Sequence, residues 1–217
     1  GAGYPEGAGA VLLIELDGLV ESVEEESEEI EAICQEFGPL EIRTATSAYE
    51  REKLWAGRKG VLGALGRLAP NYYLVDGTIP RTKLVEVITE INSISERTGY
   101  PIANLLHAGD GNLHPSILFD ERKPGDTENI LKIGAEILKV CVDAGGVLSG
   151  EHGIGLEKQE QMPLMFTDED MAAMTMLKSA FGADDRFNPG KVFPKGSGCG
   201  DITQARAIAK LGPGAYI

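Results

Sequence analysis

Two apolar runs, residues 102–107 and 114–119, constrain the fold most, because only a short turn containing Asp110-Gly111 separates them. Asp-Gly is a favoured two-residue turn between antiparallel strands. We therefore expect a hairpin centred on Asp110-Gly111 in which His107 lies directly opposite His114. The Cβ atoms of such a pair lie roughly 4.5–5.5 Å apart on one face of the sheet. That separation suits two ligands of one metal ion.

Hydrophobic periodicity predicts the other elements. Strands are expected at 11–16, 40–44, 72–76 and 147–149, and helices at 20–36, 50–68, 82–98, 127–144 and 168–181. Thr82 and Thr167 are predicted N-caps, the latter with Asp170 three residues on, and Gly99 is a predicted helix stop. Alternating strands and helices with one hairpin indicate an α+β fold. A ferredoxin-like, mostly antiparallel sheet with helices packed on one face fits best.

Composition narrows the possible partners. The net charge of −14 opposes binding to nucleic acid or to anionic membrane surfaces. No run approaches the roughly 20 apolar residues of a membrane span, and the start lacks a signal-peptide pattern. The three cysteines include no CxxC pair and are interpreted as reduced thiols. We expect a soluble, cytoplasmic protein that binds any anionic substrate through a metal ion or a placed arginine.

The remaining histidine, His152, follows Glu151 in the glycine-rich segment SGEHGIG. Two histidines and one carboxylate form a recurring catalytic metal site with an open position. Glu151 is thus a candidate third ligand and His152 a candidate base. The residues alone leave other interpretations open, namely a hydrogen-bonded structural histidine pair, a metal-dependent hydrolase and a non-catalytic ferredoxin-like binding module. GEHGIG and NPGKV lack the spacing of nucleotide-binding loops.

Two further segments are weaker signals. Arg58 in WAGRK could bind a substrate carboxylate through two parallel hydrogen bonds, although a surface arginine is the simpler interpretation. RFNPGKVFP, which contains Asn188, has the composition of a turn. From residue 182 onward Gly, Pro and Asp predict extended chain, and residues 196–217 are expected to form a peripheral tail.

Together, ELDG, WAGRK, HAGDGNLH, GEHGIGLEK and RFNPGKVFP resemble, in this order, the C-terminal domain of FAD-linked oxidases of the vanillyl-alcohol-oxidase type. The resemblance is strongest to the flavin subunit of glycolate oxidase and to D-lactate and D-2-hydroxyglutarate dehydrogenases. It implies that residues 1–195 form a substrate-binding cap domain. Its expected partners are a flavin-binding domain of the same polypeptide, which this sequence lacks, and other oxidase subunits. The chain by itself should be inactive.

The same resemblance assigns roles to individual residues. His107, His114 and Glu151 fall on ligands of a divalent metal, zinc or manganese. His152 falls on the catalytic histidine and Arg58 on the arginine that receives the substrate carboxylate, while Asn188 has a possible role on the flavin side.

Substrate choice follows from two departures from the resemblance. Where 2-hydroxyglutarate-type relatives have an asparagine and a lysine, this sequence has Ser116 and Leu74. We therefore expect Ser116 in the substrate site and a short monocarboxylate, glycolate or D-lactate, as the substrate, oxidised to a 2-oxo acid with FAD as hydride acceptor.

Overall fold

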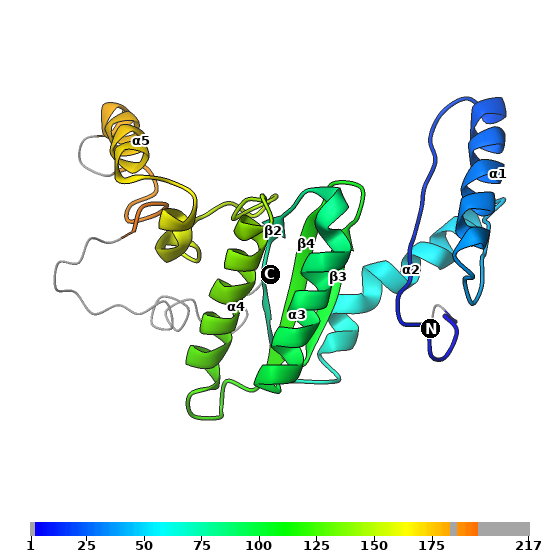
Figure 1. Cartoon of the computed structure of the whole chain (residues 1–217), viewed down its shortest axis with the longest axis horizontal. Coiled ribbons are helices and arrows are strands. Elements are labelled where there is room, and N and C mark those ends of the chain that lie inside the picture. Colours follow the sequence, from blue (N-terminus) through cyan, green and yellow to red (C-terminus); the bar gives the residue numbers. More distant parts are fainter. Residues whose placement is uncertain (1–2, 183–185, 195–217) are drawn as a thin grey trace. The chain divides into compact units, whose positions relative to one another are not determined.

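The structure, a computed structural model, describes residues 3–182 and 186–194 (Figure 1). The chain divides into two units, Gly1–Ala64 and Leu65–Ile217, and each is described by itself. The expected tail at 196–217 and Cys199 within it lie outside the described residues. The cap-domain boundary at residue 195 remains a prediction.

The sheet of the second unit is organised around β4 (Asn112–Phe119). On one side β4 pairs antiparallel with β3 (Ile102–His107). On its other side it pairs antiparallel with β1 (Asn71–Leu74), within the region of the strand predicted at 72–76, and with β2 (Gly77–Thr78), which the sequence did not predict. The predicted strand at 147–149 is reduced to a single antiparallel bridge between Val147 and Thr78. The order of elements is that of the predicted ferredoxin-like α+β fold.

Two helices, α3 (Leu84–Thr98) and α4 (Asp126–Asp143), lie side by side over one face of this sheet (Figure 1). Each has apolar residues at intervals of three or four, as the sequence predicts. These side chains form a buried core with the apolar side chains of the facing strands. Its helical members are Val87, Ile91, Ile94, Ile130, Ile133, Ile137, Leu138 and Cys141.

Of the three predicted helix-end residues, two are confirmed by the structure. Gly99 ends α3 in the left-handed conformation, at φ 74°. Thr167 caps α5 (Asp168–Phe181), and Asp170 completes a capping box despite its short side chain. Thr82 is not a cap, because residues 81–83 form a 3₁₀ turn in which Lys83 N donates to Pro80 O at 2.8 Å. The helix therefore begins at Leu84 without a side-chain cap.

The hairpin register differs from the prediction by two residues. His107 pairs with Asn112 rather than with His114, so the loop contains four residues, 108–111. A two-residue type I′ turn requires positive φ at both central positions. Gly111 has φ 71°, but Asp110 is not among the residues with positive φ. Gly111 O also accepts from Ile79 N at 2.9 Å, so a neighbouring strand helps to fix the loop.

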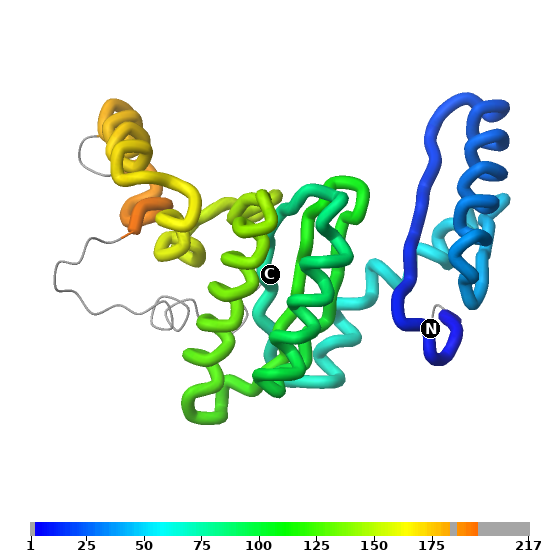
Figure 2. Tube along the Cα trace, viewed as in Figure 1, coloured from blue at the N-terminus to red at the C-terminus, as the bar shows by residue number. Residues whose placement is uncertain are grey.

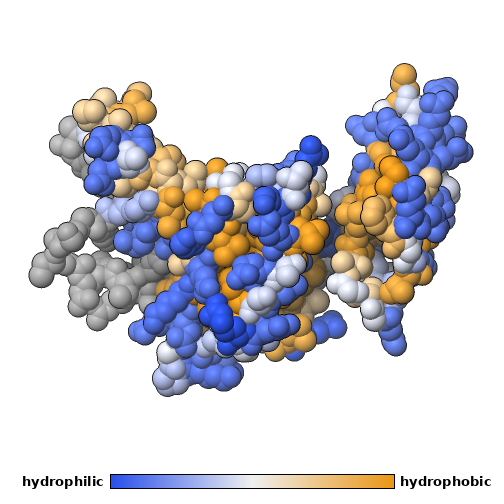
Figure 3. Space-filling model, in the orientation of Figure 1, coloured by the Kyte–Doolittle hydropathy of each residue, from blue (hydrophilic) through white to orange (hydrophobic). Residues whose placement is uncertain are grey.

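The first unit consists of α1 (Val20–Glu36), α2 (Ala48–Leu65) and extended chain. The strands predicted at 11–16 and 40–44 are wrong, because among residues 3–64 neither run has the backbone ladder that defines a strand. Both runs stay extended, and much of their apolar surface is exposed, including Leu12 and Leu40. In Figure 3 apolar residues gather beside the charged surface of α1. The bounds of α1 match the prediction.

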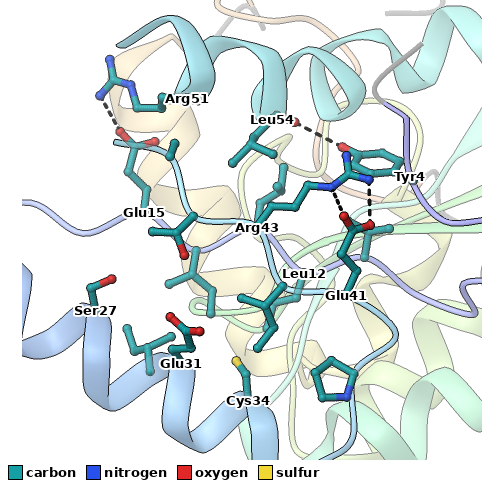
Figure 4. Close-up of a pocket in the computed structure, with 18 of the residues that line it drawn as sticks. Tyr4, Leu12, Glu15, Ser27, Glu31, Cys34, Glu41, Arg43, Arg51 and Leu54 are labelled. Atoms are coloured by element: carbon teal, nitrogen blue, oxygen red, sulfur yellow. Dashed lines mark hydrogen bonds and ion pairs between the residues drawn. The ribbon is translucent and has the colours of Figure 1, made fainter. Parts of the chain in front are cut away.

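The extended runs and the two helices of this unit line a largely apolar cavity of about 970 Å³ that is open to solvent. Figure 4 shows Leu12 and Cys34 among its lining residues. At its edge Arg43 binds the carboxylate of Glu41 through two hydrogen bonds of 2.7 Å, and Arg51 binds Glu15 at 2.9 Å. None of the candidate site residues named above lines this cavity.

Among the described residues, no helix combines the length and the apolar composition that crossing a bilayer requires.

Candidate functional site

The candidate site lies on the face of the sheet opposite α3 and α4. Successive side chains of a strand point to opposite faces. Leu113 and Ile117 of β4 belong to the helix-facing core, so His114 and Ser116 point the other way. The pairing of His107 with Asn112 places His107 on the same face. The alternation in NLHPS therefore separates core residues from site residues.

The hairpin histidines are diagonal rather than direct neighbours, yet they meet. The imidazole centroids of His107 and His114 lie 5.4 Å apart with the rings nearly perpendicular, at 87°. Diagonal positions on one face of an antiparallel pair are within reach of long side chains. The predicted proximity of the two histidines is thus confirmed, but they are diagonal neighbours and not a directly opposed pair.

Glu151 and His152 reach the same place from the segment after α4, which returns to the end of the sheet near β2 (Figure 2). Glu151 Oε1 lies 3.0 Å from His114 Nε2 and 3.5 Å from His152 Nε2. The rings of His114 and His152 are stacked, with centroids 5.2 Å apart and planes at 17°. All three histidines of the chain therefore belong to one cluster.

A carboxylate that the sequence did not single out holds this segment. Asp76, in the break between β1 and β2, accepts hydrogen bonds from the backbone N–H groups of Gly150, Glu151 and His152, at 3.1, 3.4 and 3.1 Å. The Ser149 hydroxyl donates to the same carboxylate at 2.5 Å. Three successive amides thus converge on one side chain, which turns the backbone sharply.

The counter-ion of Asp76 is Lys158, a second residue that the sequence did not reveal. Its ammonium donates to Asp76 Oδ2 at 2.8 Å and to the backbone oxygen of Asp76 at 2.7 Å. Both residues have 0% exposure. Burial favours a neutral Asp76, but the hydrogen bonds from Lys158 and Ser149 and the charge of Lys158 outweigh it and hold the pKa of Asp76 well below its usual range.

Gly150 is required by close packing at this turn. A Cβ atom on Gly150 would lie 2.4 Å from both Asn112 Oδ1 and Thr78 Oγ1, far inside normal contact. Gly153 and Gly155 have positive φ values of 77° and 55°, which side-chain-bearing residues rarely adopt. The glycines of GEHGIG therefore serve the shape of the segment.

The surroundings of His114 favour its neutral form. Burial lowers the pKa of His114, with a smaller contribution from the neighbouring His152 and His107, while the charges of Glu151 and Asp76 oppose the shift. The neutral imidazole is the form that binds metal ions. Its Nδ1 is buried without a hydrogen-bond partner among the described residues. An unpaired buried nitrogen disfavours the alternative of a hydrogen-bonded structural pair.

Two sets of side chains have metal-ligand spacing in the described part of the chain: Asp76, His114 and His152, and His107, His114 and Glu151. Both oxygens of Asp76 already accept hydrogen bonds, so the first set lacks a free carboxylate. In the second set one ligand atom from each residue lies within 4.8 Å of the others. Two of these ligand atoms, His114 Nε2 and Glu151 Oε1, are already 3.0 Å apart, which is close enough for both to bind one ion. The exposed side chains of His107 and Glu151 are free of the burial that would prevent small rotations toward an ion.

Exposure gives the site an accessible side. His114 is buried at the base of the cluster, whereas the side chains of His152 and Glu151 are 37% and 52% exposed. His107 is exposed as well. The second set thus fits a divalent cation that is bound from the sheet side and open on the other.

The remaining predicted site residues lie in three different parts of the chain. Ser116 is completely buried two residues after His114, and its hydroxyl has no partner among the described residues. Arg58 lies half-buried on α2 in the first unit, so it is not placed relative to the cluster. Asn188 is exposed, with φ 49°. Its segment contacts the GEHGIG segment, because Val192 N donates to Gly155 O at 2.7 Å.

The sequence of the chain matches a known family. The model of the family described as FAD linked oxidases, C-terminal domain, matches residues 1–192. The chain belongs to this family, as its motifs led us to expect.

The names of similar proteins fit this family. The chain is similar to the glycolate oxidase subunit GlcD of Escherichia coli (strain K12), at 44% identity over 93% of this chain and 40% of that protein. The GlcD subunit of Bacillus subtilis is 39% identical over 89% of this chain and 41% of its own length. A D-lactate dehydrogenase of Archaeoglobus fulgidus is 30% identical over 79% of this chain and 37% of its own length. The chain thus spans about two fifths of these relatives.

Proposed function

We propose that this chain is the substrate- and metal-binding part of a flavin-dependent oxidoreductase that converts a short 2-hydroxy monocarboxylate, glycolate or D-lactate, to a 2-oxo acid. The observation that supports it most is the convergence of His107, His114, Glu151 and His152, which come from segments about 40 residues apart. Membership of the FAD-linked oxidase family and the names of the relatives support the reaction class.

In this proposal each site residue of the chain has a separate role. His107, His114 and Glu151 hold a divalent cation, zinc or manganese, and Arg58 binds the substrate carboxylate. His152, next to the ligands but outside the set, accepts the proton of the 2-hydroxyl. When bound, the cation would acidify that hydroxyl and FAD would take the hydride. Asn188 is assigned to the flavin side, together with the rest of the polypeptide.

The choice of a monocarboxylate rests on two positions that face each other. Leu74 of β1 pairs directly with Ser116 of β4, on the same face as His114. Neither side chain is charged, so this place offers no ion pair to a second carboxylate. The unpaired hydroxyl of Ser116 is proposed to contact the substrate, because a buried polar group without a partner is costly. A cytoplasmic location and contacts with further oxidase subunits complete the proposal.

Metal binding tests the ligand assignment directly. Titration of the purified 217-residue chain with Co²⁺ should give one bound ion and a visible absorption band. His107→Ala and Glu151→Gln should each weaken binding at least tenfold, because each removes a ligand. His152→Asn is the matched control and should leave the affinity within a few-fold. Equal affinity in all variants would reject the assignment.

Turnover tests the reaction. A chimera can be made in which this chain replaces the matching segment of the Escherichia coli glycolate oxidase subunit. In it, His152→Asn should lower kcat about 10²–10⁴-fold, the usual contribution of a general base. The isolated chain should not oxidise glycolate or D-lactate, and turnover without the flavin-bearing part would contradict the proposal. Tighter binding of D-2-hydroxyglutarate than of glycolate would contradict the substrate assignment.

A further inference from the structure

The position of Glu151 and His152 is the least expected feature of the site. Neighbours on an extended chain point in opposite directions, yet both of these side chains face His114. Their own side chains do not produce this turn. The converging amides of residues 150–152, all directed at Asp76, do.

Asp76 connects this turn to the sheet. Leu74 pairs with Ser116 and Gly77 pairs with Leu113, which is the same register on both sides of the break between β1 and β2. Continuing that register across the break puts Asp76 opposite His114. One carboxylate therefore lies next to the buried histidine and also binds the backbone that bears the carboxylate ligand and the base.

Lys158 fixes the other end of the same segment. Its ammonium meets Asp76 seven residues after Glu151, and its backbone N donates to Ile154 O at 3.1 Å. The intervening chain contains Gly153 and Gly155, which restrict the backbone little. The segment 151–158 is thus held at both ends by one buried ion pair.

Stability alone is a poor explanation for such a pair. Removing two charges from water is costly, and replacing a buried ion pair with apolar side chains is often neutral or stabilising. A precise placement of neighbouring groups is what a pair with a fixed hydrogen-bond geometry provides. Residues that orient metal ligands typically change metal affinity 10–100-fold when mutated.

We propose that the buried Asp76–Lys158 pair is a positioning device that sets Glu151 and His152 relative to His114, and that metal affinity depends on it. This inference rests on the metal site proposed above. Neither residue touches the metal or the substrate, so both are positioning residues. They act through the backbone of residues 150–158, and Asp76 also lies next to His114.

The test compares two side-chain links to the segment 151–158, one from Asp76 and one from Tyr73 of β1. Lys158→Met and Asp76→Asn break the ion pair. Tyr73→Phe is the matched control, because it removes the partly buried hydrogen bond, 2.8 Å long, from Tyr73 to Glu157 on the helix-facing side of the strand. Affinity of the full 217-residue chain for Co²⁺ and its absorption spectrum are measured with each variant, together with thermal unfolding.

Both ion-pair variants should bind Co²⁺ 10–100-fold more weakly and with an altered spectrum, whereas Tyr73→Phe should keep affinity within threefold even though it unfolds at a lower temperature. If a single variant does not fold, the double variant Asp76→Asn with Lys158→Met leaves no charge buried and should fold with the same loss of affinity. Unchanged affinity in a folded ion-pair variant would overturn the proposal.

Amide hydrogen exchange separates this inference from the metal assignment. Without metal, the amides of residues 150–152 should be protected in the wild-type chain and in Tyr73→Phe, and should exchange at least tenfold faster in the ion-pair variants. If the wild-type chain binds no Co²⁺, the proposed metal site fails while faster exchange still supports the positioning role. Equal protection in all variants would refute the positioning role itself.

Discussion

Gly146→Ala tests whether the antiparallel bridge between Val147 and Thr78 holds the GEHGIG segment against the sheet. Gly146 does not have positive φ, so alanine causes no backbone strain of its own, and the penalty is steric. The new Cβ would lie 2.0 Å from Thr78 O and 2.7 Å from Cys141 O. Both atoms belong to the backbone, so no side chain can rotate away. Ordinary contact begins at 3.4 Å, and the chain must therefore shift by about 1.4 Å.

A shift of that size breaks the hydrogen bonds that define the bridge. Thr78 and Val147 exchange two, at 3.1 and 2.8 Å, and Gly146 N donates to Cys141 O at 2.9 Å. At about 0.5–1.5 kcal/mol each, the loss of all three amounts to about 1.5–4.5 kcal/mol. Urea unfolding followed by circular dichroism measures it as a lower midpoint with an unchanged m-value. A change below about 0.5 kcal/mol would refute the reasoning, because the bridge would then tolerate the shift.

Three further predictions concern other parts of the chain. Gly60→Ala, inside α2 with no atom within 4 Å of the added Cβ, should stabilise the first unit by about 0.5–1 kcal/mol in urea unfolding, and any destabilisation would show a hidden contact. Thr167→Ala removes the capping box of α5 and should cost about 1 kcal/mol, seen as faster amide exchange confined to that helix; no change would show that the box contributes nothing. Burial, aided by the charge of Asp76, raises the pKa of Cys141 to about 12 from 9.0. Ionisation of the unfolded thiol should therefore reduce the stability of the wild-type chain between pH 9 and 12, but not that of Cys141→Ala, and parallel unfolding profiles would contradict this.

Local patterns in the sequence predicted much of the second unit. Val87, Ile91 and Ile94 define the buried side of α3 through spacing alone, and the alternation around His114 separates the core face of β4 from the site face. Such signals depend only on neighbours within one turn or one strand. The grouping of His107 with His114 follows from the same alternation, which is why it survives the error in register.

Features that depend on distant residues were not predictable. The hairpin loop is fixed partly by Ile79, about 30 residues before it, and Asp76 and Lys158 meet across 82 positions. Nothing local distinguishes them from ordinary surface charges. The strands expected at 11–16 and 40–44 failed for the same reason. An apolar run becomes a strand only where another strand accepts its hydrogen bonds, and that partner cannot be read from the run itself.

The break between β1 and β2 at Asp76 has a consequence for the order of folding. The contacts that Asp76 makes with residues 149–158 span 73 to 82 positions, whereas the hairpin that carries His107 and His114 closes locally. Contacts between distant residues form late because closing a long loop costs chain entropy. During synthesis, a chain that ends before Lys158 has both hairpin histidines and Asp76 but lacks the ammonium group that pairs with Asp76 and holds the far end of the segment 151–158. If His107, His114 and Glu151 hold a metal ion as proposed, binding of that ion should therefore come late in the folding of this unit, after Asp76 has paired with Lys158.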